Sequence, residues 1–228
     1  MKRSEINDHL SHAIDVIARA GVALPPFARW TPDEFADRAT PAIIAAGLGW
    51  DLIDDGRGDP GRAGLIRLTL RNGSLTELAG GGGRVYAERL LILRDRHSTA
   101  MHTHLLKTGD LINRWGGTLT VRLCGSDAQG RIDRRKGITV ECDGISRWVE
   151  AGGLIRLDPG ESVALRPGDW RALRAEGGDC LMAEISTVAD DHADDLYATP
   201  RRPALPIAED AAPVHLLVRD YDLFIGRR

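Results

Sequence analysis

The sequence has few cysteines, few lysines and no long apolar run. Its three cysteines, Cys124, Cys142 and Cys180, are widely spaced and form no Cys-x-x-Cys pair. This argues against a disulfide framework or a cysteine-based zinc site and indicates reduced thiols. No stretch approaches the roughly 18 apolar residues of a membrane helix, and the N-terminus has no apolar core typical of a signal peptide. We therefore expect a cytoplasmic protein without a membrane partner.

The charged residues exclude one class of partner and single out one residue. Lys and Arg number 30 and Asp and Glu 33, so the net charge is -3. The signs are interspersed, and without a basic stripe we expect no nucleic-acid partner. Only Lys2, Lys107 and Lys136 are lysines. Because Lys107 follows two histidines by three residues, it indicates a position that uses a compact ammonium able to share a proton, although chance placement at a rim is the alternative.

Apolar periodicity changes along the chain from helical to strand spacing. Ser4 is a candidate N-cap for a first helix that ends at Gly21, and 31–34 (Thr-Pro-Asp-Glu) is a capping-box pattern for a second. From about Leu65 the chain has short apolar runs separated by turn residues, which predicts an antiparallel barrel. The predicted strands are Leu65–Leu70, Tyr86–Leu93, Thr118–Leu123, Ile138–Glu141, Gly153–Leu157, Ser162–Leu165 and Cys180–Val188.

These patterns predict a mainly β protein with one principal domain. At 228 residues and 43% hydrophobic composition, one substantial core can be buried. We expect a helical segment over 1–60, a barrel over 61–199, and an extended tail over 200–228 in which Val214–Val218 adds a last strand or clasp. The four glycines at 80–83 lack the Gly-Lys-Ser/Thr of a phosphate loop and are interpreted as a flexible hairpin tip.

The most informative motif is His102-Thr103-His104. Side chains alternate between the two faces of a strand, so His102 and His104 point to the same side. Two neutral imidazoles facing into a barrel are half of a site for a divalent Mn, Fe, Ni or Zn ion. The rest of the ligand set must come from elsewhere in the chain.

The spacing around this pair matches the two motifs of cupin barrels, but two ligand positions are substituted. Gly109 stands where the first motif has a Glu, while its closing glycine is present as Gly116. After the turn at Pro167-Gly168, Arg171 stands where the second motif has a His. Arginine stays protonated and offers no lone pair to a metal. We therefore expect a cupin jelly roll that binds well under one equivalent of metal.

Two alternatives for the histidines stay open. The imidazoles can serve as hydrogen-bonding groups after loss of the metal. Carboxylates could instead complete the site, from Asp110 or from an acidic loop over 190–195 that folds back over the barrel mouth. On a regular strand, however, Asp110 points away from the histidines.

Motifs along almost the whole chain share one family pattern. They are Met1–Asn7, Leu24–Ala28, Trp30–Pro32, Leu48–Asp51, Thr69–Gly73, Tyr86–Glu88, Met101–His104, Asp110–Arg114 and Glu184–Asp191. On these motifs the chain resembles the D-lyxose ketol-isomerase family, sugar isomerases built on a cupin barrel. The resemblance implies aldose–ketose isomerisation of the D-lyxose/D-xylulose type through an enediol intermediate.

The resemblance also implies roles for individual residues. Such isomerases hold Mn(II) with two His, a Glu and a further His, of which the first two fall on His102 and His104 and the others on the substituted positions. The family's barrel lysine falls on Lys107 and its acid–base glutamate on Glu184. With two ligands substituted, we expect reduced or absent activity.

Further residues are predicted to contact the substrate. Glu184 lies in an apolar strand and needs a cationic partner such as Lys107, Arg114 or Arg171. We assign substrate binding to Arg114, Arg171, Asp191 and Asp194. Trp115, next to Arg114, is expected to narrow or floor the pocket.

Two functions follow from different classes of protein. The first is a sugar ketol-isomerase with a degenerate metal site. The alternative is a non-catalytic cupin that binds a sugar acid or sugar phosphate through Arg171, in a pocket made cationic by Arg114 and Lys107 as well. In both cases the partner is a small sugar or sugar derivative, and we expect a homodimer formed through the N-terminal helices and the apolar run 214–218.

Overall fold

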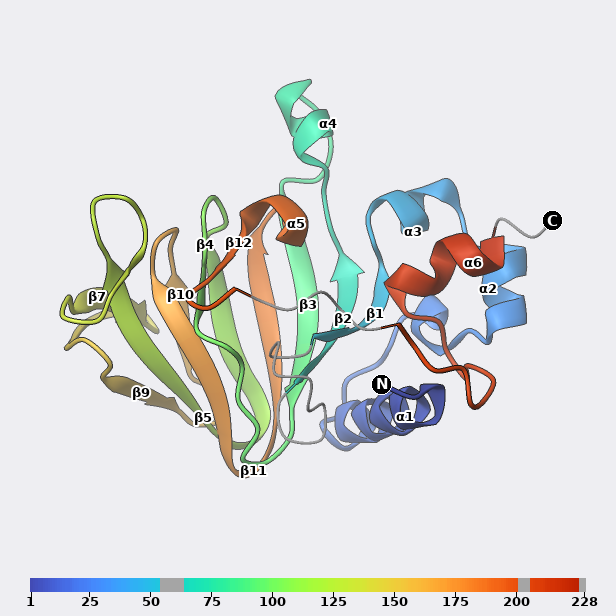
Figure 1. The fold of residues 1–228 in the computed structure, drawn as a ribbon, viewed down its shortest axis with the longest axis horizontal. Helices are drawn as coiled ribbons and strands as arrows, with labels where there is room; N and C mark the ends of the chain where they lie inside the picture. The colour runs from blue at the N-terminus through green and yellow to red at the C-terminus, as the bar shows by residue number, and fades with distance from the viewer. Residues whose placement is uncertain (54–63, 201–205, 226–228) are drawn as a thin grey trace.

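The computed structural model describes residues 1–53, 64–200 and 206–225, and its core is an antiparallel sheet (Figure 1). The main path of the sheet has the order β1-β2-β3-β11-β5-β10-β7-β8, and β4, β6, β9 and β12 pair beside it. The predicted mainly β architecture, an antiparallel sheet consistent with a jelly roll, is therefore confirmed. The end strands β1 and β8 do not pair with each other in the described residues, so hydrogen bonds do not close the barrel there.

The strands are β1 Gly49–Ile53, β2 Leu65–Arg71, β3 Tyr86–Leu93, β4 His102–His104, β5 Gly109–Ser126, β6 Ile132–Asp133, β7 Ile138–Cys142, β8 Ile145–Val149, β9 Leu154–Leu157, β10 Ser162–Leu165, β11 Trp170–Thr187 and β12 Asp195–Tyr197. The helices are α1 Arg3–Arg19, η1 Pro26–Arg29, α2 Pro32–Arg38, α3 Pro41–Ala45, α4 Leu75–Ala79, α5 Asp191–Asp194, η2 Val218–Asp220 and α6 Tyr221–Ile225.

Two strands run far beyond the predicted limits. The predicted segments Thr118–Leu123 and Cys180–Val188 are parts of β5 and β11, which have 18 residues each and pair with one another along most of their length. The pairing continues through polar residues because the backbone N–H and C=O groups of β5 and β11 bond to each other whatever the side chains are. Gly116 allows the close approach: its φ is +104°, and a Cβ there would lie 1.8 Å from the Asp179 carbonyl oxygen.

Two apolar cores hold the sheet. One lies inside the curved sheet, with β5 and β11 as its centre. The other lies between the sheet and α1, which buries one apolar stripe that includes Ile6, Leu10 and Ile17. Figure 1 shows α1, α2, α3 and α6 grouped beside β1, at the opposite end of the molecule from β7.

The N-terminal helices follow the predicted pattern with one shift. The capping box of α2 is confirmed, since Thr31 Oγ1 accepts from the Glu34 amide at 3.2 Å and Glu34 Oε2 accepts from the Thr31 amide at 3.0 Å. Helix α1 begins at Arg3, so Ser4 is not its cap. Instead, Ser4 Oγ donates to Asp210 Oδ2 at 2.8 Å and ties the helix to the C-terminal segment.

The C-terminal segment is a clasp and not a strand. Over 214–218 the chain makes one isolated bridge, between Leu217 and Trp50, and buries Leu216 and Leu217 against the helices and the sheet. The prediction of a last strand there is wrong, because these apolar side chains pack in the helical layer. Arg3 is fully buried and pairs with Asp220 at 2.8 Å, which fixes the clasp to α1.

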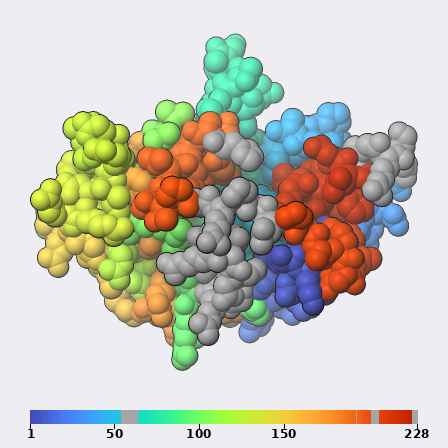
Figure 2. All heavy atoms as spheres, viewed as in Figure 1, coloured from blue at the N-terminus to red at the C-terminus, as the bar shows by residue number. Residues whose placement is uncertain are grey.

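The expected segment boundaries are only partly visible. Strand β1 belongs to the segment predicted as helical, and it pairs with β2 through the whole of Gly49–Ile53. The predicted boundary at 60/61 and tail residues 201–205 lie outside the described residues. The glycines at 80–83 follow α4, an unpredicted helix that projects from the body of the molecule (Figure 2). No helix within the described ranges is long and apolar enough to cross a membrane.

Candidate active site

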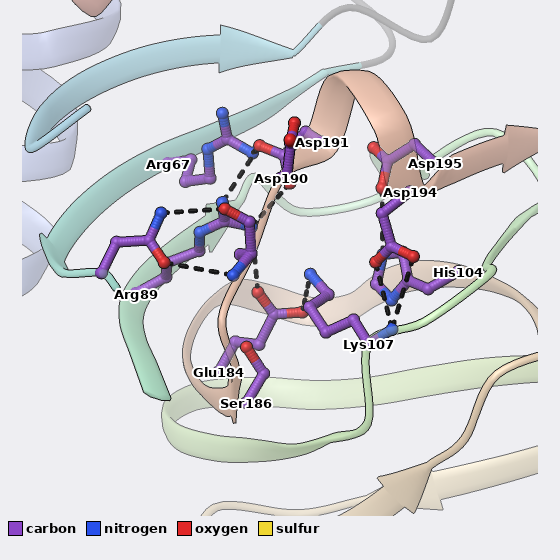
Figure 3. Close-up of polar contacts among 12 residues, drawn as sticks. Arg67, Arg89, His104, Lys107, Glu184, Ser186, Asp190, Asp191, Asp194 and Asp195 are labelled. Carbon is purple, nitrogen blue, oxygen red and sulfur yellow. Dashed lines mark hydrogen bonds and ion pairs between the residues drawn. The ribbon is translucent and has the colours of Figure 1, made fainter. Parts of the chain in front are cut away.

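A cavity inside the sheet is lined by residues of β2, β3, β4, β5, β11 and β12. Its apolar wall includes Leu65, Leu91, Leu111 and Leu173. Figure 3 shows the contacts among the polar groups described below. They come from strands far apart in sequence, which the sheet order brings together. The cavity is thus a polar site set in a largely apolar core.

Lys107 and Glu184 form the centre of the polar side. Lys107 is 3% exposed, and its Nζ donates to Glu184 Oε1 at 3.1 Å. Arg89 Nη1 approaches the other carboxylate oxygen at 3.4 Å. Burial alone would raise the pKa of Glu184, but Lys107 and Arg89 hold it well below its usual range. Burial lowers the pKa of Lys107, and Glu184 opposes that shift.

The Lys107–Glu184 pair is one of several pairings that the sequence predicts for Glu184, whereas the contact with Arg89 was not predicted. Arg89 lies directly opposite Glu184 in the β3–β11 register. The available signal was the pair of charged residues Glu88 and Arg89 within the otherwise largely apolar segment Tyr86–Leu93, because a charged side chain that is buried must find a counter-charge.

Asp191 joins this centre to a second arginine. Arg89 donates to both Asp191 oxygens, at 2.9 and 3.0 Å. Arg67 Nη1 also contacts Asp191, and its Nη2 donates to Asp51 Oδ2 at 2.6 Å. Burial would raise the pKa of Asp191, but the two guanidinium groups hold it far below the usual value. Asp191 lines the cavity as predicted, but it is bound to protein cations.

Asp194 has a different position from the one predicted. Its carboxylate accepts from the amides of Leu105, Leu106 and Lys107, at 2.9, 2.5 and 3.2 Å. It is buried and does not line the cavity, so the expectation that it faces the sugar is wrong. The next residue, Asp195, lines the cavity instead, because β12 pairs with β4 and sets Asp195 opposite His104.

The two histidines share their corner of the cavity with Arg171. Arg171 lies opposite His102 in the β11–β4 register and is 4% exposed. Its Nη2 lies 2.7 Å from His104 Nε2 and also contacts Nδ1 of that ring. His102 Nδ1 lies 2.9 Å from the Ala100 carbonyl oxygen, which only accepts, so Nδ1 carries the proton of the neutral ring. Burial and then Arg171 lower the pKa of both imidazoles.

These residues do not fit the Mn(II) that the resemblance implied. The guanidinium of Arg171 lies 2.7 Å from His104 Nε2, and Gly109 has no side chain that could coordinate a metal ion. A Cβ on Gly109 would lie 2.6 Å from Ser186 Cβ and 2.9 Å from the Ile185 carbonyl oxygen, so the packing of β5 on β11 leaves no room for a glutamate. Among the described residues no three His, Cys, Asp or Glu side chains cluster in a way that could hold a metal ion.

Arg114 and Trp115 lie outside the cavity, contrary to prediction. The β5–β11 register shifts between Leu181 and Met182, which pair with Trp115 and Asn113, so Arg114 is the extra residue of a bulge and its side chain is exposed. Trp115 packs in the core beneath α1, where the guanidinium of Arg19 lies 5.3 Å from its ring centroid.

The charges that line the described part of the cavity are balanced, so the predicted cationic pocket is wrong. Asp110, the second residue of β5, was expected to point away from the histidines; it is exposed and lines the cavity. The basic residues of the wall are Arg67, Arg89, Lys107 and Arg171, and the acidic ones are Asp110, Glu184, Asp191 and Asp195. Arg67 and Arg89 add two positive charges that were not predicted for the cavity, and Asp110 and Asp195 add two negative charges that offset them.

Solved structures with the same architecture define the class of the fold. A mutant L-ribose isomerase from Acinetobacter sp. DL28, in complex with L-ribose, superposes with a TM-score of 0.59 at 12% identity, covering 94% of this chain and 96% of that one. L-ribose isomerase from Cellulomonas parahominis without ligand gives a TM-score of 0.56 at 12% identity, covering 87% and 93%. The fold is that of the cupin-type sugar isomerases.

Closer relatives then give the family. D-lyxose/D-mannose isomerase from Escherichia coli O157:H7 is 38% identical over 229 residues, covering 98% of this chain and all of the relative. The enzyme of that name from Serratia proteamaculans is 37% identical over 233 residues, covering 99% and 100%. The D-lyxose isomerase family matches residues 1–221, and the chain belongs to it.

Proposed function

We propose that this protein is a sugar ketol-isomerase that interconverts D-lyxose and D-xylulose or a closely related aldose–ketose pair. Membership of the D-lyxose isomerase family supports the reaction class. The observation that carries the proposal is the Lys107–Glu184 pair, a buried ammonium and a largely buried carboxylate 3.1 Å apart in the wall of the cavity. Buried titratable pairs of this kind are typical of acid–base sites.

The pair supplies what a ketol isomerisation requires. The lowered pKa of Glu184 keeps its carboxylate ionised at neutral pH, ready to accept the C2 proton of the open-chain aldose. The C–H electrons form the C1–C2 double bond while O1 takes a proton, which gives the enediol. Return of a proton to C1 and loss of the O2 proton complete the ketose. Lys107 holds Glu184 in place and offers a proton beside the developing charge.

The balance of charge favours a neutral sugar over the alternative ligands. Three basic groups of the cavity wall pair with protein carboxylates: Arg67 and Arg89 with Asp191, and Lys107 with Glu184. A sugar acid or phosphate would bring an additional negative charge beside those carboxylates. A neutral aldose brings no net charge, and its hydroxyl groups can donate to the carboxylates and accept from the cationic N–H groups. The observations therefore favour the isomerase over the anion-binding alternative.

The test is conversion of D-lyxose followed by NMR in D2O, with deuterium appearing at the exchanged carbon. Glu184→Gln and Lys107→Met should each lower kcat by roughly 10²–10⁴-fold, the usual contribution of a general acid or base. Glu150→Gln, an identical change at an exposed turn, should leave the rate unchanged. A Glu184→Gln enzyme that is folded and as fast as the parent would refute the assignment.

We also propose that the protein is a cytoplasmic homodimer. Leu216 and Leu217 of the run 214–218 are buried within the chain, so the support comes instead from exposed apolar side chains of β8 and β9. These are Ile145, Trp148 and Leu154, of which Trp148 is 70% exposed. Three free, buried cysteines support a reducing compartment. Sedimentation should give twice the 24.8 kDa of one chain, and Trp148→Glu should return it to one chain's mass.

A further inference from the structure

We propose that the guanidinium of Arg171 stands in place of a divalent cation, so that this enzyme excludes a metal ion from its histidine pair and isomerises its sugar without one. The inference rests on the proposed function for the reaction itself. Its structural basis lies in three observations about the corner formed by β4, β5 and β11.

The first observation is where the charge of Arg171 lies. Its Nη2 is 2.7 Å from His104 Nε2, and its strand pairs with β4 at His102. A metal ion bound through His104 would need the lone pair that faces this N–H group. It would also stand within a few ångströms of a permanent positive charge in a site shielded from water, where like charges repel strongly. One cation therefore excludes the other.

The second observation is that packing closes the next ligand position. Any side chain at Gly109 would meet Ser186 Cβ at 2.6 Å and the Ile185 carbonyl oxygen at 2.9 Å. The strands β5 and β11 pair here, Gly109 with Ser186, so the contact is with a fixed backbone. The two substitutions are therefore compatible with each other: β5 and β11 pair tightly at Gly109, and the guanidinium of Arg171 lies against His104.

The third observation is that Arg171 retains donors for a substrate. Its protein hydrogen bonds within the described residues go to His104 and, from Nη1, to the Asp169 carbonyl oxygen at 3.3 Å. A guanidinium has five N–H donors in a fixed plane. The remaining donors can reach the carbonyl oxygen of an open-chain sugar and the oxygens of its enediolate, the charge that the reaction develops.

Asp195 completes the corner. Its Oδ1 is buried without a hydrogen bond in the described structure and lies 3.2 Å from His104 Nε2. A carboxylate oxygen in this position balances the guanidinium and can accept a sugar hydroxyl. A neutral sugar would therefore find a donor plane in Arg171 and an acceptor in Asp195, both beside His104 Nε2.

The test measures metal binding and catalysis separately on the full chain. Mn(II) binding is followed by electron paramagnetic resonance, and D-lyxose conversion is followed by NMR in chelator and in added Mn(II). The parent should bind no stoichiometric Mn(II) and should convert D-lyxose at the same rate in both media. Stoichiometric Mn(II) on the parent, or activity lost in chelator and restored by Mn(II), would overturn the inference.

Variants at Arg171 separate charge from geometry. Arg171→His removes the cation and adds an imidazole, and it should tighten Mn(II) binding by more than about tenfold. Arg171→Lys keeps the charge and should still exclude Mn(II), while its kcat falls and its fold, checked by thermal melting, persists. Equal Mn(II) affinity in parent and Arg171→His would overturn the inference.

The two proposals can fail independently. If the parent excludes Mn(II), Arg171→His binds it, and no medium supports conversion of D-lyxose or related aldoses, the proposed function is refuted while the exclusion of metal by Arg171 is upheld. The binding measurement on the parent requires no variant to fold.

Discussion

Replacement of Asp194 by asparagine tests whether this residue positions Lys107 or binds sugar. The Asp194 carboxylate accepts from three consecutive amides, the last of which belongs to Lys107, and it is buried. Asparagine has the same shape but is neutral, and its NH2 group would face the Lys107 amide, donor against donor. The turn that carries the lysine would then lose its anchor.

The expected cost follows from these contacts. Hydrogen bonds to a charged group contribute about 1.5–3 kcal/mol, so Asp194→Asn should lower the free energy of unfolding by about 2–3 kcal/mol. Asp194→Ala removes the acceptor of the Leu106 and Lys107 amides, while the Leu105 amide keeps its 3.0 Å bond to the backbone carbonyl of residue 194. The change should cost roughly 3–5 kcal/mol. A shift of about 1 Å in a reacting group can cost about 10²-fold in rate, so kcat should fall while KM changes little.

Urea unfolding gives the first quantity and initial rates at saturating and limiting D-lyxose give the second. The matched control is Asp15→Asn, the same change at an exposed position of α1, which should stay within about 0.5 kcal/mol of the parent. A stable Asp194→Asn enzyme whose defect is confined to KM would refute the positioning role and return Asp194 to the substrate.

Three further outcomes are expected. Arg3→Met should lower the free energy of unfolding by about 3–5 kcal/mol, because it leaves the carboxylate of Asp220 buried without its cation. Arg38→Met, at the exposed pair with Glu34, should cost under about 0.5 kcal/mol. Equal effects of the two changes in urea unfolding would contradict this. Gly109→Ala should cost about 1–3 kcal/mol through overlap with β11, while Gly82→Ala, in open space, should be nearly neutral by the same measurement. Burial and Arg171 lower the pKa of both β4 imidazoles, so below about pH 6.5 the unfolded chain binds more protons than the folded chain. The free energy of unfolding should therefore fall as pH falls, by up to about 1.4 kcal/mol per pH unit for each ring. A flat profile of unfolding free energy between pH 7 and 5 would show that the rings are not held neutral.

Much of the site could be predicted from sequence because its signals are local. The period of two places His102 and His104 on one side of a strand, and the capping chemistry of Thr31 and Glu34 requires neighbours three residues apart. The spacing from this pair identified the substituted position at Gly109. Each inference depends on covalent geometry over a few residues, which the sequence contains.

The sequence by itself thus determined the jelly-roll class, the histidine pair and the substituted ligand positions, whereas only the tertiary structure decided which charges meet. Arg89 reaches Glu184 because β3 and β11 pair in one register, and Asp195 rather than Asp194 faces the cavity because β12 lies against β4. The bulge in β5 turned Arg114 outward. A shift of one residue in strand pairing moves a side chain to the other face, and registers are set by contacts between segments distant in sequence.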